Sequence, residues 1–217
     1  VSSLVEKSSP LNGTNLDLIP IAEKGEFEQR IRNRGESVAR SGRGFDAELD
    51  DLFFLYSWVR QTCAIAVLEF GTGWSTIALS MALNENRQCF ADTYTLRHPN
   101  PFELCTVDAS AEYSADALGR LSAPELDCVK AVVCTPRQTR EYGTYVSFFE
   151  ALPFFVPDLI YLDGPAPEQV MGTINGFAGV GRHGLPMAAD LLRLEAHMWP
   201  NTMIIVDGRS ANARFLA

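Results

Sequence analysis

Short apolar runs alternate with helical patterns along most of the chain. Apolar residues recur at helical spacing over 47–62, with Asp46 as a candidate N-cap. Buried strands are predicted at 64–70, 103–108, 128–134, 159–163 and 203–207. Helices are predicted at 75–84, 111–121 after Ser110 as a cap, 145–152, and 187–198 with Pro186 in its first turn. Short strands separated by helices predict an α/β fold with a doubly wound, mainly parallel sheet.

The first 44 residues follow a different pattern. They are polar and interrupted by glycine and proline, apart from a short helical candidate at 26–33. We therefore predict an N-terminal extension or cap at 1–44 and a single domain at 45–217.

Composition and charge limit the partners of this domain. Hydrophobic residues make up 47% and charged residues 21%, as in ordinary globular proteins. The net charge of −9 disfavours nucleic acid and anionic membrane surfaces, so a small molecule is the expected partner. The five cysteines and three histidines lack metal-binding spacings, and no metal site is predicted. No apolar run approaches the length of a membrane span, and a cytoplasmic location is the working expectation.

Acidic or glycine-rich residues follow almost every predicted strand. The first strand ends in the segment Glu69 to Thr76, and the others end in Asp108, Asp163 and Asp207. In a doubly wound sheet, ligands bind in the crevice outside the carboxyl ends of the strands. These residues are therefore the candidate site.

The turn after the first strand favours a ligand that carries both charges. Gly71 and Gly73 allow a sharp turn and close approach, and the following helix directs free N–H groups into the same space. A dinucleotide fingerprint would have glycine where Thr76 stands, and the acid Glu69 precedes the turn. An amino-acid moiety, with a carboxylate and an ammonium group, fits better than NAD.

The segment V-L-E-F-G-T-G-W-S-T resembles the first motif of class I S-adenosylmethionine-dependent methyltransferases, and P-D-L-I-Y-L-D-G-P fits the fourth strand of that family. The resemblance implies a Rossmann-like domain that binds S-adenosylmethionine. The residues that would lie along its methionine part are Glu69, Gly71, Thr72, Gly73 and Ser75. Asp108 would bind the ribose hydroxyls, and Thr135 would lie at the adenine edge.

The chain departs from this family pattern at several positions. Ser75 stands where a glycine often closes the motif. The spacing from Gly73 to Asp108 is longer than is typical of such a unit, so Asp92, which lies closer to the turn in sequence, is a rival candidate for binding the ribose. The formal G-x-G-x-x-G at 179–184 lacks a preceding strand, so we interpret it as a loop near the substrate. His183 in this loop is an alternative proton-transfer residue.

The resemblance implies methyl transfer to a small molecule, with oxygen as the favoured acceptor atom. Asp163 is the predicted base. Some related enzymes bind a metal between such an acid and an Asp-Asn pair, but Gly208 follows Asp207 here, so metal dependence is not predicted. An NAD-type oxidoreductase, an aminopropyl transferase and a non-catalytic cofactor-binding module remain alternatives.

The resembled fold continues past its fifth strand with a helix and two antiparallel strands. Only Gly208 to Ala217 follow Asp207 in this chain. We therefore expect the sheet to lack its C-terminal strands, either because a segment is missing or because a second copy covers the edge in a homodimer.

Overall fold

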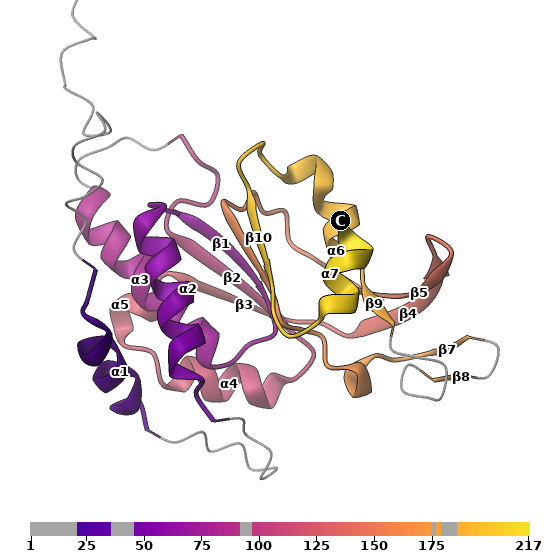
Figure 1. Cartoon of the computed structure of the whole chain (residues 1–217), viewed down its shortest axis with the longest axis horizontal. Coiled ribbons are helices and arrows are strands. Elements are labelled where there is room, and N and C mark those ends of the chain that lie inside the picture. Colours follow the sequence, from indigo (N-terminus) through magenta and orange to yellow (C-terminus); the bar gives the residue numbers. More distant parts are fainter. Residues whose placement is uncertain (1–20, 36–45, 92–96, 175–176, 179–185) are drawn as a thin grey trace, which may run out of the picture.

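The computed structural model describes residues 21–35, 46–91, 97–174, 177–178 and 186–217. Their central feature is a parallel sheet with the order β10-β6-β1-β2-β3 (Figure 1). Its strands are β1 (Ala66–Phe70), β2 (Glu103–Asp108), β3 (Val129–Val133), β6 (Leu159–Leu162) and β10 (Met203–Val206). The chain moves outwards from β1 to β3 and then returns to build β6 and β10 on the other side. This is the predicted doubly wound α/β sheet, whose strand order reverses beside β1.

Helices cover both faces of this sheet (Figure 1). Those on one side are α1 (Lys24–Arg32), α2 (Leu49–Gln61), α3 (Trp74–Phe90), α4 (Ala111–Gly119) and α5 (Ala123–Leu126). The other side carries α6 (Asp190–Leu194) and α7 (Ser210–Leu216). Alternate residues of β1 supply the two cores, since Val67 packs with α2 and α3 whereas Leu68 packs with α6. None of the helices in the described part of the chain is long and apolar enough to cross a membrane.

The predicted helices at 47–62, 75–84 and 111–121 and all five predicted strands of the main sheet are confirmed, with small shifts at their ends. The predicted cap of α4 is also present, because the Ser110 side chain accepts a hydrogen bond from the Tyr113 N–H group. The helix α3 extends to Phe90, beyond its predicted end at residue 84.

The predicted helix at 145–152 is wrong. This segment forms β5 (Thr144–Phe149), which pairs antiparallel with β4 (Pro136–Glu141). Tyr142 and Gly143 make the connecting turn with φ values of 51° and 75°. Two successive positive φ values match the twist of a tight hairpin, and the aromatic and β-branched residues of β5 favour a strand.

The predicted helix at 187–198 is only partly correct. It begins as β9 (Met187–Ala188), which pairs with β5, and continues as α6 and the 3-10 helix η3 (Glu195–His197). The segment 187–188 forms a strand because it pairs with β5, which belongs to the hairpin that the sequence did not predict. The smaller elements between β6 and β9 are η2 (Pro167–Gln169), β7 (Thr173–Ile174) and β8 (Phe177–Ala178).

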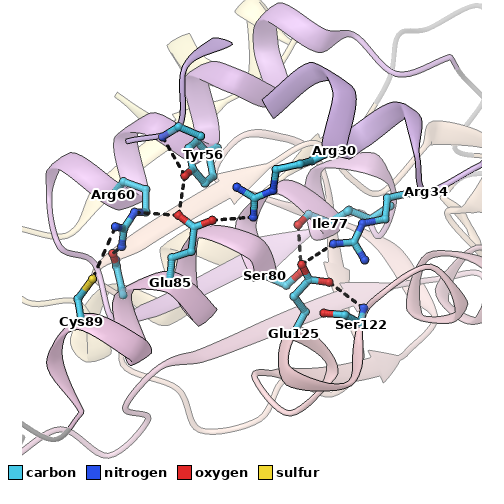
Figure 2. A network of polar contacts seen from close by, with 12 residues as sticks. Arg30, Arg34, Tyr56, Arg60, Ile77, Ser80, Glu85, Cys89, Ser122 and Glu125 are labelled. Atoms are coloured by element: carbon cyan, nitrogen blue, oxygen red, sulfur yellow. Dashed lines mark hydrogen bonds and ion pairs between the residues drawn. The ribbon is translucent and has the colours of Figure 1, made fainter. Parts of the chain in front are cut away.

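The described part of the predicted extension at 1–44 belongs to the core. Phe27 and Ile31 of α1 are fully buried among residues of α2 and α3. Arg30 also forms an ion pair with Glu85 of α3, at an Nη2–Oε1 distance of 2.7 Å (Figure 2). Apolar packing and this pair therefore anchor α1 to the helical layer that borders the cleft described below.

The strand β10 forms one edge of the sheet in the described part of the chain. Residues 210–216 after it fold as α7, on the same side of the sheet as α6. The homodimer expected across this edge stays a prediction.

The buried carboxyl group of Asp190 gives a prediction about pH and stability. One oxygen accepts the Phe149 N–H group at 2.9 Å, whereas Oδ2 is buried and lacks a hydrogen-bond partner among the described residues. Burial raises the pKa of Asp190 to about 7. Ionisation therefore costs more in the folded than in the unfolded chain, and this penalty grows from about pH 4 to about pH 7.

We expect Asp190→Asn to raise the melting temperature at about pH 8 and to have little effect near pH 4. Each pKa unit corresponds to about 1.4 kcal/mol, and the new buried amide offsets part of the gain. A net gain of about 1 kcal/mol would raise the melting temperature by about 3 °C in a chain of this size. Thermal melts monitored by circular dichroism at the two pH values measure the difference. An equal effect at both would contradict the assignment.

Candidate active site

The turn between β1 and α3 depends on the absence of a side chain at Gly71. Its φ is +100°, and a Cβ there would lie 3.0 Å from the backbone nitrogen of Gly164 after β6. Gly164 is equally constrained, since its own Cβ would lie 2.9 Å from the Gly71 nitrogen. Gly71 therefore lets the backbone turns after β1 and β6 come into direct contact.

The carboxyl group of Glu69 lies beneath this turn and does not line the cleft. It is fully buried and accepts hydrogen bonds from Ser75 Oγ at 2.5 Å and Thr76 Oγ1 at 2.6 Å. Burial raises its pKa to about 7, although the hydroxyl donors oppose the shift. The structure thus positions Glu69 to hold the first turn of α3. The sequence predicts a direct contact between Glu69 and a ligand, but the Glu69 carboxyl group does not form part of the cleft wall.

Gly73 has open space where Gly71 has none. An added Cβ at Gly73 would meet nothing within 4 Å, and its φ of −174° is extended. Gly73 lines the cleft together with Thr72 and Ser75, and α3 begins at the next residue. The glycine that offers space to a ligand is therefore Gly73, while Gly71 is needed for the packing of the turn.

Asp108 joins the turn to the end of β2. Its Oδ2 accepts the Thr72 N–H group at 2.8 Å, and its Oδ1 accepts the Ser110 N–H group. Burial raises the pKa of Asp108, and these backbone donors oppose the shift. Asp108 lines the cleft, so the structure brings it together with Gly73 as predicted.

Asp163 and Asp207 lie at the ends of β6 and β10 and line the same cleft. The Tyr161 hydroxyl donates to Asp207 Oδ2 at 2.9 Å, and burial raises the pKa of Tyr161. Asp163 is exposed at the cleft surface. Its pKa is nevertheless raised to about 6, mainly because nearby protein atoms remove water from the carboxyl group and secondly because of the negative charge of Asp207. Arg209 acts in the opposite direction on Asp163.

Together these elements enclose a cleft of about 550 Å³ at the carboxyl ends of the strands. Its wall includes the loop before α2, the glycine turn, one side of α4 and the residues after β6 and β10. Eight carboxylates and two guanidinium groups line it: Asp46, Glu48, Asp51, Asp108, Asp116, Asp163, Glu168, Asp207, Arg120 and Arg209. The cleft therefore has a strongly negative surface.

The predicted residue Thr135 is not brought to this cleft. Thr135 is exposed, its carbonyl accepts the Glu150 N–H group at 3.1 Å, and it is not part of the cleft wall. The adenine contact predicted for Thr135 thus has no support from its position. Asp92 and the 179–184 loop with His183 lie outside the described residues.

Sequence reasoning also missed parts of the wall. Glu48 and Asp51 had the pattern of acids at a helix start, which is ordinarily a structural signal. Tyr161 had the pattern of a core residue within an apolar strand. Only the meeting of α2 with the ends of β6 and β10 identifies them as wall residues.

No group of three or more His, Cys, Asp or Glu residues within the described ranges is arranged to hold a metal ion.

No protein-family model and no curated protein sequence matches the chain. Among solved structures it is similar to one described as "a putative O-methyltransferase from Klebsiella pneumoniae". The two are 20% identical, the alignment covers 93% of this chain and 72% of that chain, and the TM-score is 0.47. At this level of similarity, the ligand of the cleft has to be argued from the residues that line it. The parallel sheet described above is consistent with the fold of class I methyltransferases.

Proposed function

We propose that this chain is an S-adenosylmethionine-dependent methyltransferase that acts on an oxygen atom of a small molecule. One observation carries the proposal. The backbone of Gly73, with open space beside it, lines a strongly negative cleft at the carboxyl ends of the parallel strands. Asp108 lines the same cleft from the neighbouring strand.

The charge of the cleft favours this donor over NAD. S-adenosylmethionine carries a sulfonium and an ammonium group against one carboxylate, whereas NAD carries a negatively charged diphosphate. Eight carboxylates against two guanidinium groups attract the first and repel the second. The N–H groups and the positive dipole end at the start of α3 offer one location for the donor's carboxylate.

The residues of the cleft suit the shape of a nucleoside donor. Gly73 and Ser75 would hold the methionine part, and Asp108 would accept the ribose hydroxyls. The Asp108 carboxylate already interacts with the backbone N–H groups of Thr72, Ser110 and Ala109. With about four acceptor sites in all, it retains capacity for a ribose hydroxyl. Leu52 and Leu55 add an apolar part to the wall, which would help to exclude water.

When bound, the donor supplies an electrophilic methyl group. Asp163 would take the proton of the acceptor hydroxyl, because it lies at the surface of the cleft. With a pKa of about 6, its carboxylate is mostly ionised at neutral pH and still basic enough to act.

Calorimetric titration of the intact chain tests the proposal. We expect S-adenosylmethionine to bind with a stoichiometry of one and NAD to give no measurable heat of binding under the same conditions. Binding of NAD without binding of either S-adenosylmethionine or its demethylated product would contradict the proposed function.

A further inference from the structure

The end of β6 lies directly beside the glycine turn. The N–H groups of Asp163 and Gly164 both donate to the Phe70 carbonyl, at 2.9 and 2.6 Å. The close contact of Gly71 with Gly164 brings the two turns together. A ligand that follows the turn from Gly73 towards β6 therefore comes next to the Asp163 carboxylate.

A second carboxylate reinforces this negative charge. The Asp207 N–H group donates to the Leu162 carbonyl at 3.0 Å, which places Asp207 at the end of the next strand. Its side chain is oriented by the hydrogen bond from Tyr161. Among neighbouring charges, that of Asp207 has the largest effect on Asp163, and Glu48 adds a smaller effect of the same sign.

The two arginines of the wall only partly balance these acids. Arg120 forms an ion pair with Asp116, and its Cζ atom lies 4.5 Å from the centre of the Trp74 ring. Its positive charge is therefore balanced mainly by Asp116 on α4. Arg209 favours the charged form of Asp163, and its guanidinium is held by a hydrogen bond to the Pro165 carbonyl. It is one positive charge beside the two carboxylates of Asp163 and Asp207. The ends of β6 and β10 thus retain an excess of negative charge towards the cleft.

We propose that Asp163 and Asp207 make this cleft prefer the cationic sulfonium donor to the neutral thioether product, S-adenosylhomocysteine. The proposal rests on the proposed function. Methyl transfer breaks the bond between sulfur and methyl carbon and leaves the electron pair on sulfur, so the sulfonium charge disappears. The new bond forms to the acceptor oxygen, whose proton passes to Asp163. Attraction between the carboxylates and the ligand then weakens, which favours release of the product.

Calorimetric titration of both compounds against wild type, Asp163→Asn and Asp207→Asn tests this preference. We expect wild type to bind S-adenosylmethionine about tenfold or more tightly than S-adenosylhomocysteine, at low salt. Each variant should lose most of that ratio through weaker binding of the cation, with the affinity for the thioether almost unchanged. The asparagine at 207 retains an oxygen that can accept the Tyr161 hydrogen bond, so the change is mainly one of charge.

Asp108→Asn is the matched control. Both compounds contain the same ribose, so this variant should weaken both. Asp108 lies at the end of β2 and not beside β6 and β10, so the ratio should fall less than in the Asp163 and Asp207 variants. Equal or tighter binding of the thioether to wild type, or an unchanged ratio in both test variants, would overturn the inference. If neither compound binds to wild type, the proposed function itself fails.

A pH series gives a second readout. The charged groups that act on Asp163 in the described part of the chain include Asp207 and Arg209 after β10, Asp108 at the end of β2 and Glu48 before α2. The titratable groups of Glu69 on β1 and Tyr161 on β6 also interact with it. The pKa of about 6 for Asp163 means that lowering the pH from about 8 to about 5 protonates this carboxyl group in the free protein. The preference for the cation should therefore shrink at about pH 5. A ratio that does not change with pH would also contradict the inference.

Discussion

Replacing Gly73 by leucine should abolish binding of S-adenosylmethionine while the chain remains folded. The added side chain would meet no protein atom within 4 Å of its Cβ, and the extended φ of −174° is open to any residue. It would instead enter the part of the cleft beside the turn, where the proposed donor would lie. We expect an affinity loss of about 100-fold or more, which corresponds to about 2.7 kcal/mol.

Calorimetry and thermal melts on the same preparation separate binding from folding. The helix α3 has no side-chain cap at Gly73, so leucine should cost less than about 1 kcal/mol of stability there. Gly73→Ala, with a much smaller side chain, should give an intermediate affinity. Unchanged affinity in the leucine variant would show that the donor does not pass Gly73.

Gly71→Ala should cause a large loss of stability. Alanine would have to adopt a φ of +100°, and its Cβ would lie 3.0 Å from the backbone nitrogen of Gly164. Neither the strand ends nor the turn can move far, because Gly164 and Asp163 are hydrogen-bonded to Phe70. Backbone strain and overpacking together should cost about 3 kcal/mol or more.

A drop of about 10 °C in melting temperature is the measurable consequence for a chain of this size. Gly73→Ala is the matched control, because the same substitution two residues later meets open space. A Gly71→Ala variant as stable as the control would contradict the observed contact between the two turns. The pair thus distinguishes the glycine required for folding from the glycine required for binding.

Much of the fold could be predicted from local sequence. The strands β1 and β6 are buried on both faces, so each consists largely of apolar residues that stand out in the chain. The hairpin of β4 and β5 was missed because the strand 136–141 is mostly polar, and its stability depends on pairing with 144–149. Such pairing is invisible in a single segment.

The order of strands and acidic residues along the chain is enough to predict where the candidate site lies. Asp108 and Asp163 follow parallel strands, and the carboxyl ends of such strands meet at one edge, so their approach follows from the order of elements alone. Gly73, at the end of the neighbouring strand β1, lines the same cleft.

The role of each side chain in the turn depends on packing that is formed only in the folded chain. Glu69 has the residue type of a ligand-binding acid, yet the folded chain turns it towards Ser75 and Thr76 beneath α3. Gly71 has the same residue type as Gly73, but it packs against Gly164 from a distant part of the chain. Spacing along the sequence specifies which residues share a turn. The direction of each side chain depends on the segments that pack around that turn, and these come together only in the folded chain.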